Sequence, residues 1–366
     1  MTSVRDPLAA RPPEVRVLIV DDSVVVREIL KRMLESDPAI RVVGMAADGS
    51  EAVELTAQLR PDLVTMDLVM PGMSGMEATE RIMAYHPTPV LFFSSYFERE
   101  GMYSRLDALA AGALDIMEKP TLTPDSGWEA LAGALTEKVK VLAQVPVVTH
   151  MHGAHVFTRQ RLRTPVVAGN APAIDVVGIG ASSGGPKVLE ELLSALPPTY
   201  ALAVIVVQHM AEGFMPGLLS WLQQRCPLPV RIAEEGEVIL PRRVLFAPDW
   251  AHVVVQPEGR VHLSEGDPVN GHRPSVDVTF SSLAKVYGNR AAGMLLTGMG
   301  ADGAAGLLAL RQAGGETFVQ NEESCVVFGM PRAAIELGAA QNVLPPSGLI
   351  RSLKAFHGDR LRSLTR

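Results

Sequence analysis

The amino-acid sequence predicts an α/β protein with two doubly wound parallel-sheet domains. Apolar runs of strand length alternate with amphipathic segments from residue 15 to about residue 140, and the alternation resumes at residue 174. Strands that alternate with helices form a parallel sheet covered on both faces. The stretch between the two regions carries prolines without periodicity, so we expect the chain to divide there. The expected parts are a disordered N-terminus (1–14), a first domain (15–138), a linker (139–172) and a second domain (173–360).

Four apolar runs in the first region predict buried strands. An amphipathic segment follows the first of them, with Val26, Ile29 and Met33 at helical spacing. Helical segments also separate the later runs, which completes the alternation expected of a parallel sheet. The four runs are VRVLIV (15–20), DLVTMD (62–67), PVLFFS (89–94) and DIMEK (115–119).

The expected linker is rich in residues that interrupt regular structure. Pro146 and Pro165 lie within it, and neither helical nor strand periodicity extends through it. His150, His152 and His155 stand at a spacing that a metal ion accepts, although histidines in a linker are more often simply solvated. Both interpretations stay open from the sequence alone.

Seven apolar runs in the second region predict its strands, and leucine-rich segments predict its helices. Leu189 and Leu192 share one helix face, and Leu218 and Leu222 share another. The region near 230–265 has shorter runs, which favour an antiparallel hairpin insert. The seven runs are DVVGIG, ALAVIVVQ, RVLFAP, HVVVQ, RVHLS, AGMLL and ETFVQ.

Composition excludes several classes of protein. The chain of 366 residues has a formal net charge of −7, which gives no basic field for nucleic acid. Two cysteines, Cys226 and Cys325, indicate a reducing compartment without a disulfide framework. No apolar run reaches the ~18 residues of a membrane span, and the N-terminus has no apolar signal core. We therefore expect a cytoplasmic protein that neither inserts into membranes nor binds nucleic acid.

Three carboxylates stand at strand ends of the first domain. Asp21 and Asp22 directly follow the first strand, and Asp67 ends the strand at 62–67. The carboxyl ends of parallel strands meet at one sheet edge, where three negative charges repel one another unless a cation neutralises them. Mg²⁺ suits such a set, because it takes one or two carboxylates together with water and phosphate oxygens. The alternative is that Asp21, Asp22 and Ser23 merely cap a helix.

Two more polar side chains end the following strands. Ser94 and Lys119 are expected at the same edge, where a hydroxyl and an ammonium group suit the oxygens of a phosphoryl group on Asp67. The motifs VLIVDDS, DLVTMDLVMPGMSG and MEKP resemble the receiver domain of two-component response regulators over about residues 15–138. The resemblance implies a flavodoxin-like fold for this domain.

The receiver resemblance also implies roles for individual residues. Asp67 is implied to accept phosphate from a histidine kinase, and Asp21, Asp22 and Asp67 are implied to hold Mg²⁺. The main-chain carbonyl of Val69 is implied as a further metal ligand. Ile116 stands where many receivers carry an aromatic switch residue, so we expect other residues to transmit the signal.

The second domain opens with a glycine-rich segment, GIGASSGG (178–185). Gly178 and Gly180 match a dinucleotide-binding G-x-G-x-x-G pattern, but Ser183 stands at the third position and no acid follows about 20 residues later. The same segment matches G-x-S-x-G, in which small neighbours expose the hydroxyl of Ser182 at a sharp strand-to-helix turn. A plain turn of small residues is the third interpretation.

A nucleophilic serine needs a base, and the base needs an orienting acid. His209 ends the strand that follows the Ser182 strand, so we expect it either at the same edge as the serine or merely capping its strand. His252 and His262 flank strands of the expected hairpin and are weaker candidates. Asp302 lies in a glycine-rich turn after an apolar run and is the candidate acid, or the N-cap of the following helix.

Five motifs make the second domain similar to the chemotaxis receptor methylesterase family, often called CheB. They are GIGASSGGP, QHM, NGHRPSVD, LTGMGADGA and SCVVFGMPRAA. The resemblance implies a Rossmann-like domain with an antiparallel hairpin insert and a triad of Ser182, His209 and Asp302. It places the main chain of Met299 near the oxyanion and Ser183 beside the nucleophile, where the family usually has threonine.

The resemblance implies hydrolysis of glutamate γ-methyl esters on methyl-accepting chemoreceptors, with release of methanol, and deamidation of receptor glutamines. No cofactor is implied in the catalytic domain. The receiver is implied to inhibit until a histidine kinase phosphorylates Asp67. Three alternatives stay open: an enzyme of a non-motility chemosensory pathway, a hydrolase of small esters, and an inert signalling adaptor.

Overall fold

The chain divides into two compact units between Gly153 and Ala154. Each unit is an α/β domain with its own parallel sheet, so the predicted fold class is confirmed. The histidines of the expected linker lie outside the described residues, as does almost all of the expected disordered N-terminus. The computed structural model describes residues 14–94, 113–119, 128–145, 147, 173–210 and 213–364.

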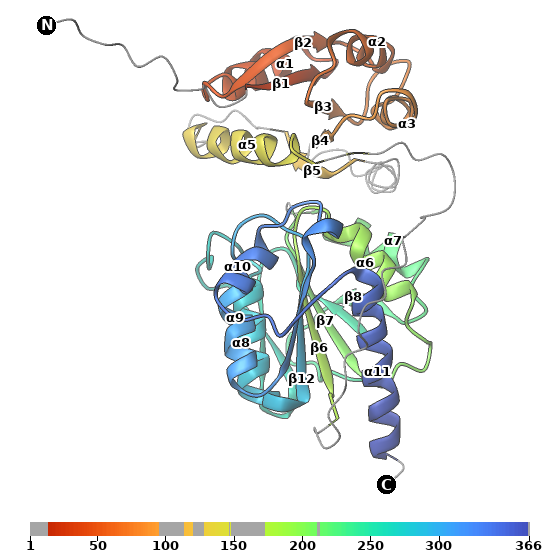
Figure 1. Cartoon of the computed structure of the whole chain (residues 1–366), viewed down its shortest axis with the longest axis vertical. Helices are drawn as coiled ribbons and strands as arrows, with labels where there is room; N and C mark the ends of the chain where they lie inside the picture. The colour runs from red at the N-terminus through yellow and green to blue at the C-terminus, as the bar shows by residue number, and fades with distance from the viewer. Residues whose placement is uncertain are drawn as a thin grey trace, which may run out of the picture. The chain divides into compact units, whose positions relative to one another are not determined.

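The first unit contains a five-stranded parallel sheet in the order β2-β1-β3-β4-β5. Helix α1 (Val24–Leu34) contacts α5 (Trp128–Leu142), and α2 (Gly49–Leu59) contacts α3 (Gly75–Tyr85), as Figure 1 shows. The strands are β1 (Val15–Val20), β2 (Ile40–Ala46), β3 (Leu63–Asp67), β4 (Val90–Ser94) and β5 (Asp115–Glu118).

Strand β2 is absent from the four runs that the sequence predicts. It lies at the edge of the sheet beside β1, and only its two end residues, Ile40 and Ala46, are fully buried. An edge strand that is only partly covered does not need a continuous apolar run. A search for such runs therefore misses it.

The second unit contains a seven-stranded sheet in the order β14-β13-β12-β6-β7-β9-β8, and every pairing in it is parallel. The central strands are buried along their whole length, which explains their continuous apolar runs. The strands are β6 (Val176–Ala181), β7 (Ala203–Gln208), β8 (Val230–Ile232), β9 (Val244–Phe246), β12 (Ala291–Leu295), β13 (Glu316–Gln320) and β14 (Asn342–Leu344).

Helices cover both faces of this sheet. Helices α8, α9 and α10 gather on one face, and α6, α7 and α11 gather on the other (Figure 1). The arrangement is the doubly wound one that the alternation predicts. The helices are α6 (Gly185–Ser194), α7 (Met215–Gln223), α8 (Val276–Tyr287), α9 (Ala304–Gln312), α10 (Met330–Glu336) and α11 (Pro346–Leu364).

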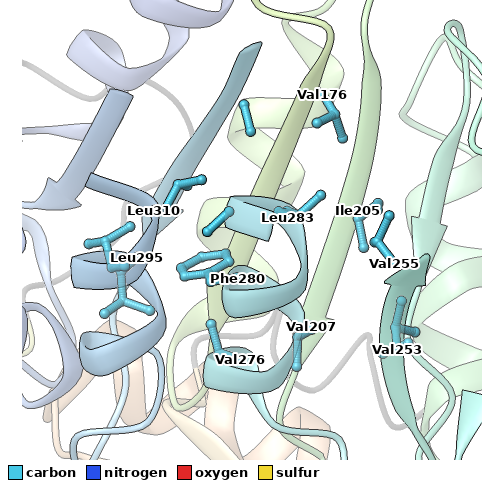
Figure 2. Close-up of a cluster of buried hydrophobic side chains, with 14 of the residues drawn as sticks. Val176, Ile205, Val207, Val253, Val255, Val276, Phe280, Leu283, Leu295 and Leu310 are labelled. Carbon is cyan, nitrogen blue, oxygen red and sulfur yellow. The ribbon is translucent and has the colours of Figure 1, made fainter. Parts of the chain in front are cut away.

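The antiparallel insert is shorter than the expected region 230–265. Strands β8 and β9 belong to the parallel sheet, and only β10 (His252–Gln256) and β11 (Arg260–Ser264) form a hairpin. The hairpin packs on α8, where Val253 and Val255 share a buried cluster with Phe280 (Figure 2). Short apolar runs therefore mark two different structures here, and their length alone does not separate them.

Two expected domain boundaries fall inside helices. Helix α5 runs through Leu142, past the expected boundary at residue 138, and α11 runs through Leu364, past residue 360. Buried side chains in the last turns, Val139 and Leu142 in α5, account for the first of these extensions.

Candidate active site

The glycine-rich segment of the second unit forms a sharp strand-to-helix turn. Ser182 follows β6 directly, and Gly184 precedes α6 in the left-handed conformation (φ 77°) that glycine adopts without strain. The N–H of Gly185 donates to the carbonyl of Ser182 at 2.8 Å, which closes the turn. Ser182 is half-buried at this turn. The geometry matches the exposed-serine interpretation of the segment.

Two glycines of the dinucleotide-like pattern have a packing role instead. A Cβ on Gly178 would lie 2.7 Å from Leu283 Cδ1, and a Cβ on Gly180 would lie 2.3 Å from Val276 Cγ1. Both glycines belong to β6, and both neighbours belong to α8. These glycines therefore let α8 lie close against the central strand, and they do not form a phosphate-binding loop.

His209 lies at the same sheet edge as Ser182. It follows β7, which pairs with β6 along its whole length, and its N–H donates to the carbonyl of Ala181 at 2.9 Å. The Gln208 side chain donates from Nε2 to the carbonyls of Ser182 and His209, at 2.9 Å each. These bonds fix the two residues relative to each other. The structure shows no hydrogen bond between Ser182 Oγ and the described His209 ring, so a proton transfer between them would require the hydroxyl to approach the ring.

Asp302 is fully buried and faces the His209 ring. Its Oδ2 lies 2.9 Å from His209 Nε2. The Ser275 hydroxyl and the Val276 N–H, at the start of α8, both donate to the carboxylate at 2.7 Å. Burial by itself raises the pKa of this carboxyl, but His209 and these two donors hold the pKa of Asp302 at about 2.

The expected alternative role of Asp302, as the N-cap of the helix that follows it, is wrong. Gly303 is the N-cap residue of α9 and provides no side-chain cap. The Asp302 carboxylate instead accepts N–H groups from the first turn of α8, which is a different helix. A negative charge is favourable there because the N-terminus of a helix carries positive potential.

The two ring nitrogens of His209 have different environments. Nε2 bonds to Asp302, whereas Nδ1 is buried and has no partner among the described residues. An ionised Asp302 can only accept, so the neutral ring carries its proton on Nε2 and presents the lone pair of Nδ1. In the common triad the carboxylate holds Nδ1 of the histidine, whereas Asp302 here contacts Nε2.

The loop after β12 lies against Ser182. A Cβ on Gly298 would lie 2.7 Å from Ser182 Cβ, and Thr297 accepts the Ser182 N–H at its carbonyl, at 3.0 Å. The main-chain N–H of Met299 has no acceptor among the described residues, so it can donate to an oxyanion. Ser183 is buried, and its carbonyl accepts the Thr297 hydroxyl at 2.9 Å.

The two weaker histidine candidates lie in other hydrogen-bond networks. His252 is buried between the carbonyl of Asp267 and the N–H of Ser275. His262 is partly exposed, and its Nδ1 lies 3.1 Å from Glu235 Oε1. Both therefore support the local structure of the hairpin region.

Four residues at the site were not predicted individually: Gln208, Thr297, Ser275 and His272. All four lie inside the motifs QHM, NGHRPSVD and LTGMGADGA, so these motifs were the available signal. Nothing in one sequence separates residues that support a site from those that only support the fold.

The first unit brings its expected acidic residues together. Carboxylate oxygens of Asp21, Asp22 and Asp67 lie within 4.8 Å of one another. Lys119 Nζ lies 2.9 Å from Asp21 and 2.7 Å from Asp67. Burial raises the pKa of Asp67 to about 6 against the opposing effect of Lys119, and the negative charge of Asp21 adds to the rise.

This acidic cluster fits a hard divalent cation. Three carboxylates stand against one ammonium group, and two of the carboxylates are buried. Such an excess of negative oxygen ligands suits Mg²⁺. Of the three residues that could instead have capped a helix, only Ser23 does so. Its side chain accepts the N–H of Val26 at the start of α1.

Three predicted residues of the first unit remain: Val69, Ser94 and Ile116. Val69 is about half exposed, and its N–H bonds to Asp67. Ser94 ends β4, but its side chain lies outside the described part of the chain. Ile116 is half-buried in β5 and packs against the core of the unit.

In the described part of the chain, no helix is both long and apolar enough to cross a lipid bilayer.

Comparisons with known proteins extend these observations. The family model "CheB methylesterase" matches residues 177–353, and "Response regulator receiver domain" matches residues 17–130. Protein-glutamate methylesterase/protein-glutamine glutaminase 1 of Syntrophus aciditrophicus (strain SB) is 41% identical over 357 residues, covering 94% of this chain and 99% of that protein.

One further relative and one solved structure also match the chain. Protein-glutamate methylesterase/protein-glutamine glutaminase 2 of Anaeromyxobacter dehalogenans (strain 2CP-C) is 43% identical over 347 residues, covering 95% of this chain and 98% of that protein. The crystal structure of the Thermotoga maritima CheB methylesterase catalytic domain is 37% identical, with a TM-score of 0.48, and covers 50% of this chain and 98% of that one.

Proposed function

Because the chain belongs to the CheB methylesterase family and carries a response regulator receiver domain, we propose that it demethylates chemoreceptors with Ser182, His209 and Asp302. The proposed substrates are glutamate γ-methyl esters on methyl-accepting chemoreceptors. The observation that carries the proposal is the hydrogen bond between fully buried Asp302 and the His209 ring, at the sheet edge that also presents Ser182.

In the proposed first step, the Ser182 hydroxyl attacks the ester carbonyl while Nδ1 of His209 takes its proton. Asp302 keeps the other ring proton on Nε2 and stabilises the imidazolium that forms. The imidazolium then gives its proton to the departing methoxide, so methanol leaves and an acyl-serine remains. No metal or cofactor takes part in this step.

In the second step, water attacks the acyl-serine with His209 again as the base. The serine hydroxyl is restored, and the receptor keeps a free glutamate. The same sequence with a primary amide releases ammonia in place of methanol, so receptor glutamine becomes glutamate. We include this deamidation in the proposal.

The tetrahedral intermediate carries negative charge on the former carbonyl oxygen. The free main-chain N–H of Met299, together with donors of the turn before α6, is the proposed oxyanion site, with Ser183 beside the nucleophile. A donor of this kind contributes about 3 kcal/mol to the barrier reduction.

Replacing Ser182 with alanine tests the assignment. Methanol release from methylated receptor fragments is expected to fall by at least about 10³-fold, because the nucleophile is gone. Ser194→Ala is the matched control, since Ser194 is an exposed serine at the far end of α6 and should leave the rate unchanged. Substantial methanol release by Ser182→Ala would contradict the proposal. A wild type that hydrolyses a simple ester but does not demethylate the receptor fragment would also contradict it.

The first unit is proposed to regulate this activity. A histidine kinase phosphorylates Asp67, with Mg²⁺ held by Asp21, Asp22, Asp67 and the carbonyl of Val69. Mg²⁺ would neutralise the carboxylates and the incoming phosphoryl oxygens, and Lys119 and Ser94 would pair with the phosphoryl group. The unphosphorylated receiver inhibits the methylesterase, and phosphorylation relieves the inhibition.

A further inference from the structure

A tight turn precedes α8 beside the active site. The N–H of Val269 donates to the carbonyl of His272 at 3.0 Å, and the N–H of His272 donates back to Val269 at 2.9 Å. Asn270 and Gly271, the two residues between them, both have positive φ angles, of 53° and 78°. Two such residues define a type I′ hairpin turn, for which Asn-Gly is the preferred sequence. The sequence therefore encodes this turn locally.

The turn presents two side chains to the active site. The His272 ring lies face to face with the His209 ring, with centroids 3.9 Å apart and an interplanar angle of 6°. Asn270 Nδ2 lies 2.8 Å from Asp277 and 3.4 Å from Asp302. The turn thus contacts both members of the His209–Asp302 pair, although the chain segment that carries it belongs to neither of their loops.

From this geometry we propose that His272 is a positioning residue for His209. The inference rests on the proposed function of His209 as the base. One hydrogen bond, from Nε2 to Asp302, leaves the ring able to tilt about that bond. A flat ring stacked on its face restrains the tilt.

The stack also leaves the reactive edge of His209 available. A second hydrogen bond to Nδ1 would occupy the lone pair that must accept the serine proton. Contact with the face of the ring restrains its plane without using either nitrogen. The face of an aromatic ring also stabilises a neighbouring cation, such as the imidazolium of His209 during the reaction.

The experiment replaces His272 in the full-length chain and follows methanol release from a methylated receptor fragment. His272→Ala removes the stacked ring, and kcat is expected to fall roughly 10- to 100-fold with KM unchanged, because the base loses its alignment. His272→Phe keeps a flat face and is expected to retain kcat within about threefold of wild type. His262→Ala is the matched control, since His262 is a partly exposed histidine that contacts Glu235, and it should leave kcat unchanged.

A second pair of variants moves the ring without removing it. Gly271→Val places a β-branched residue at a positive φ, and this backbone strain disfavours the turn. No atom lies within 4 Å of the added Cβ, so the substitution causes no steric clash there. Its kcat should fall as in His272→Ala. Gly338→Val is the control, because Gly338 also has a positive φ (71°) and open space but lies after α10. It carries the same strain and should keep the wild-type kcat.

The outcomes separate this inference from the proposed function. If the wild type releases no methanol, or if Ser182→Ala remains active, the result contradicts the proposed function itself. If wild type is active and Ser182→Ala is not, the His272 variants decide. A KM increase without a kcat change in His272→Ala, a loss in His272→Phe as large as in the alanine variant, or a wild-type kcat in Gly271→Val overturns the positioning role.

Discussion

At the scale of single residues, each unit buries a carboxylate, but the pKa values of the two carboxylates shift in opposite directions once the neighbouring groups are included. Asp302 accepts hydrogen bonds from Ser275, Val276 and His209, and these donors keep its pKa at about 2 despite burial. Asp67 shares the Lys119 ammonium with another buried aspartate, and burial raises the pKa of Asp67 to about 6. A fully compensated carboxylate suits a fixed orienting role. An undercompensated one suits a site that receives a cation and a phosphoryl group.

The lowered pKa of Asp302 predicts a dependence of stability on pH. Its value in the folded protein, about 2, lies below the ordinary 3.8, so ionised Asp302 stabilises the fold above about pH 4. The stabilisation, about 2 kcal/mol, is lost as the pH falls from about 4 towards 2. The measurement is the difference in unfolding free energy of the second unit between wild type and Asp302→Asn, from denaturant titrations at several pH values. A difference that stays constant down to pH 2 would contradict the assigned pKa.

At the scale of elements, three loops at the carboxyl edge of the sheet are joined through one side chain. The Thr297 hydroxyl, after β12, donates to the carbonyl of Ser183, after β6. The same hydroxyl accepts the N–H of Val327, in the loop between β13 and α10, at 2.9 Å. Because the hydroxyl bonds to both neighbouring loops, the turn at Ser182 and the loop after β12 are held as one unit.

Gly298 tests how closely these loops must approach. A Cβ there would lie 2.3 Å from Met330 Sδ and 2.7 Å from Ser182 Cβ, so Gly298→Ala has to displace the turn at Ser182. We expect kcat to fall roughly 10- to 100-fold, because displacement of about 1 Å costs that much in a positioned site. The unfolding free energy should fall by about 1–3 kcal/mol through overpacking.

The matched control for Gly298→Ala is Gly133→Ala in α5, where nothing lies within 4 Å of the added Cβ. This variant should keep full activity and gain about 0.5–1 kcal/mol of stability, because alanine is the better helix former. Wild-type kcat in Gly298→Ala, with both variants folded, would argue against close packing of the loop after β12 on Ser182.

At the scale of the whole molecule, the chain joins a response regulator receiver domain to a methylesterase domain. The two compact units have separate sheets and separate hydrophobic cores. The proposed chemistry in the second unit needs no metal, whereas the proposed phosphorylation of Asp67 in the first would use Mg²⁺. Regulation and catalysis can therefore be removed independently of each other.

This independence gives a test with a phosphodonor. Treatment with a small phosphodonor and Mg²⁺ should raise the methylesterase rate of wild type, because phosphorylation of Asp67 relieves the proposed inhibition. Asp67→Ala should keep the basal rate and show no stimulation. Chelation of Mg²⁺ should abolish the stimulation in wild type and leave the basal rate intact. Equal stimulation of wild type and Asp67→Ala would refute regulation through this residue.

Much of this protein follows from local sequence patterns. Continuous apolar runs predicted the buried central strands, because strands covered on both faces need apolar residues at every position. The positions of Asp21, Asp67 and Lys119 at strand ends predicted that they meet, because parallel strands end at one edge. The same reasoning placed Ser182 and His209 together.

Tertiary structure alone decided the rest. Which nitrogen of His209 meets Asp302, 93 residues away, depends on how β7 and the loop after β12 are packed. The stack of His272 on His209 depends on where α8 places the turn before it, although the Asn-Gly turn itself is local. Periodicity and turn preferences report the environment of a residue within its own element. They carry no information on the distance between side chains from different elements, because packing sets that distance.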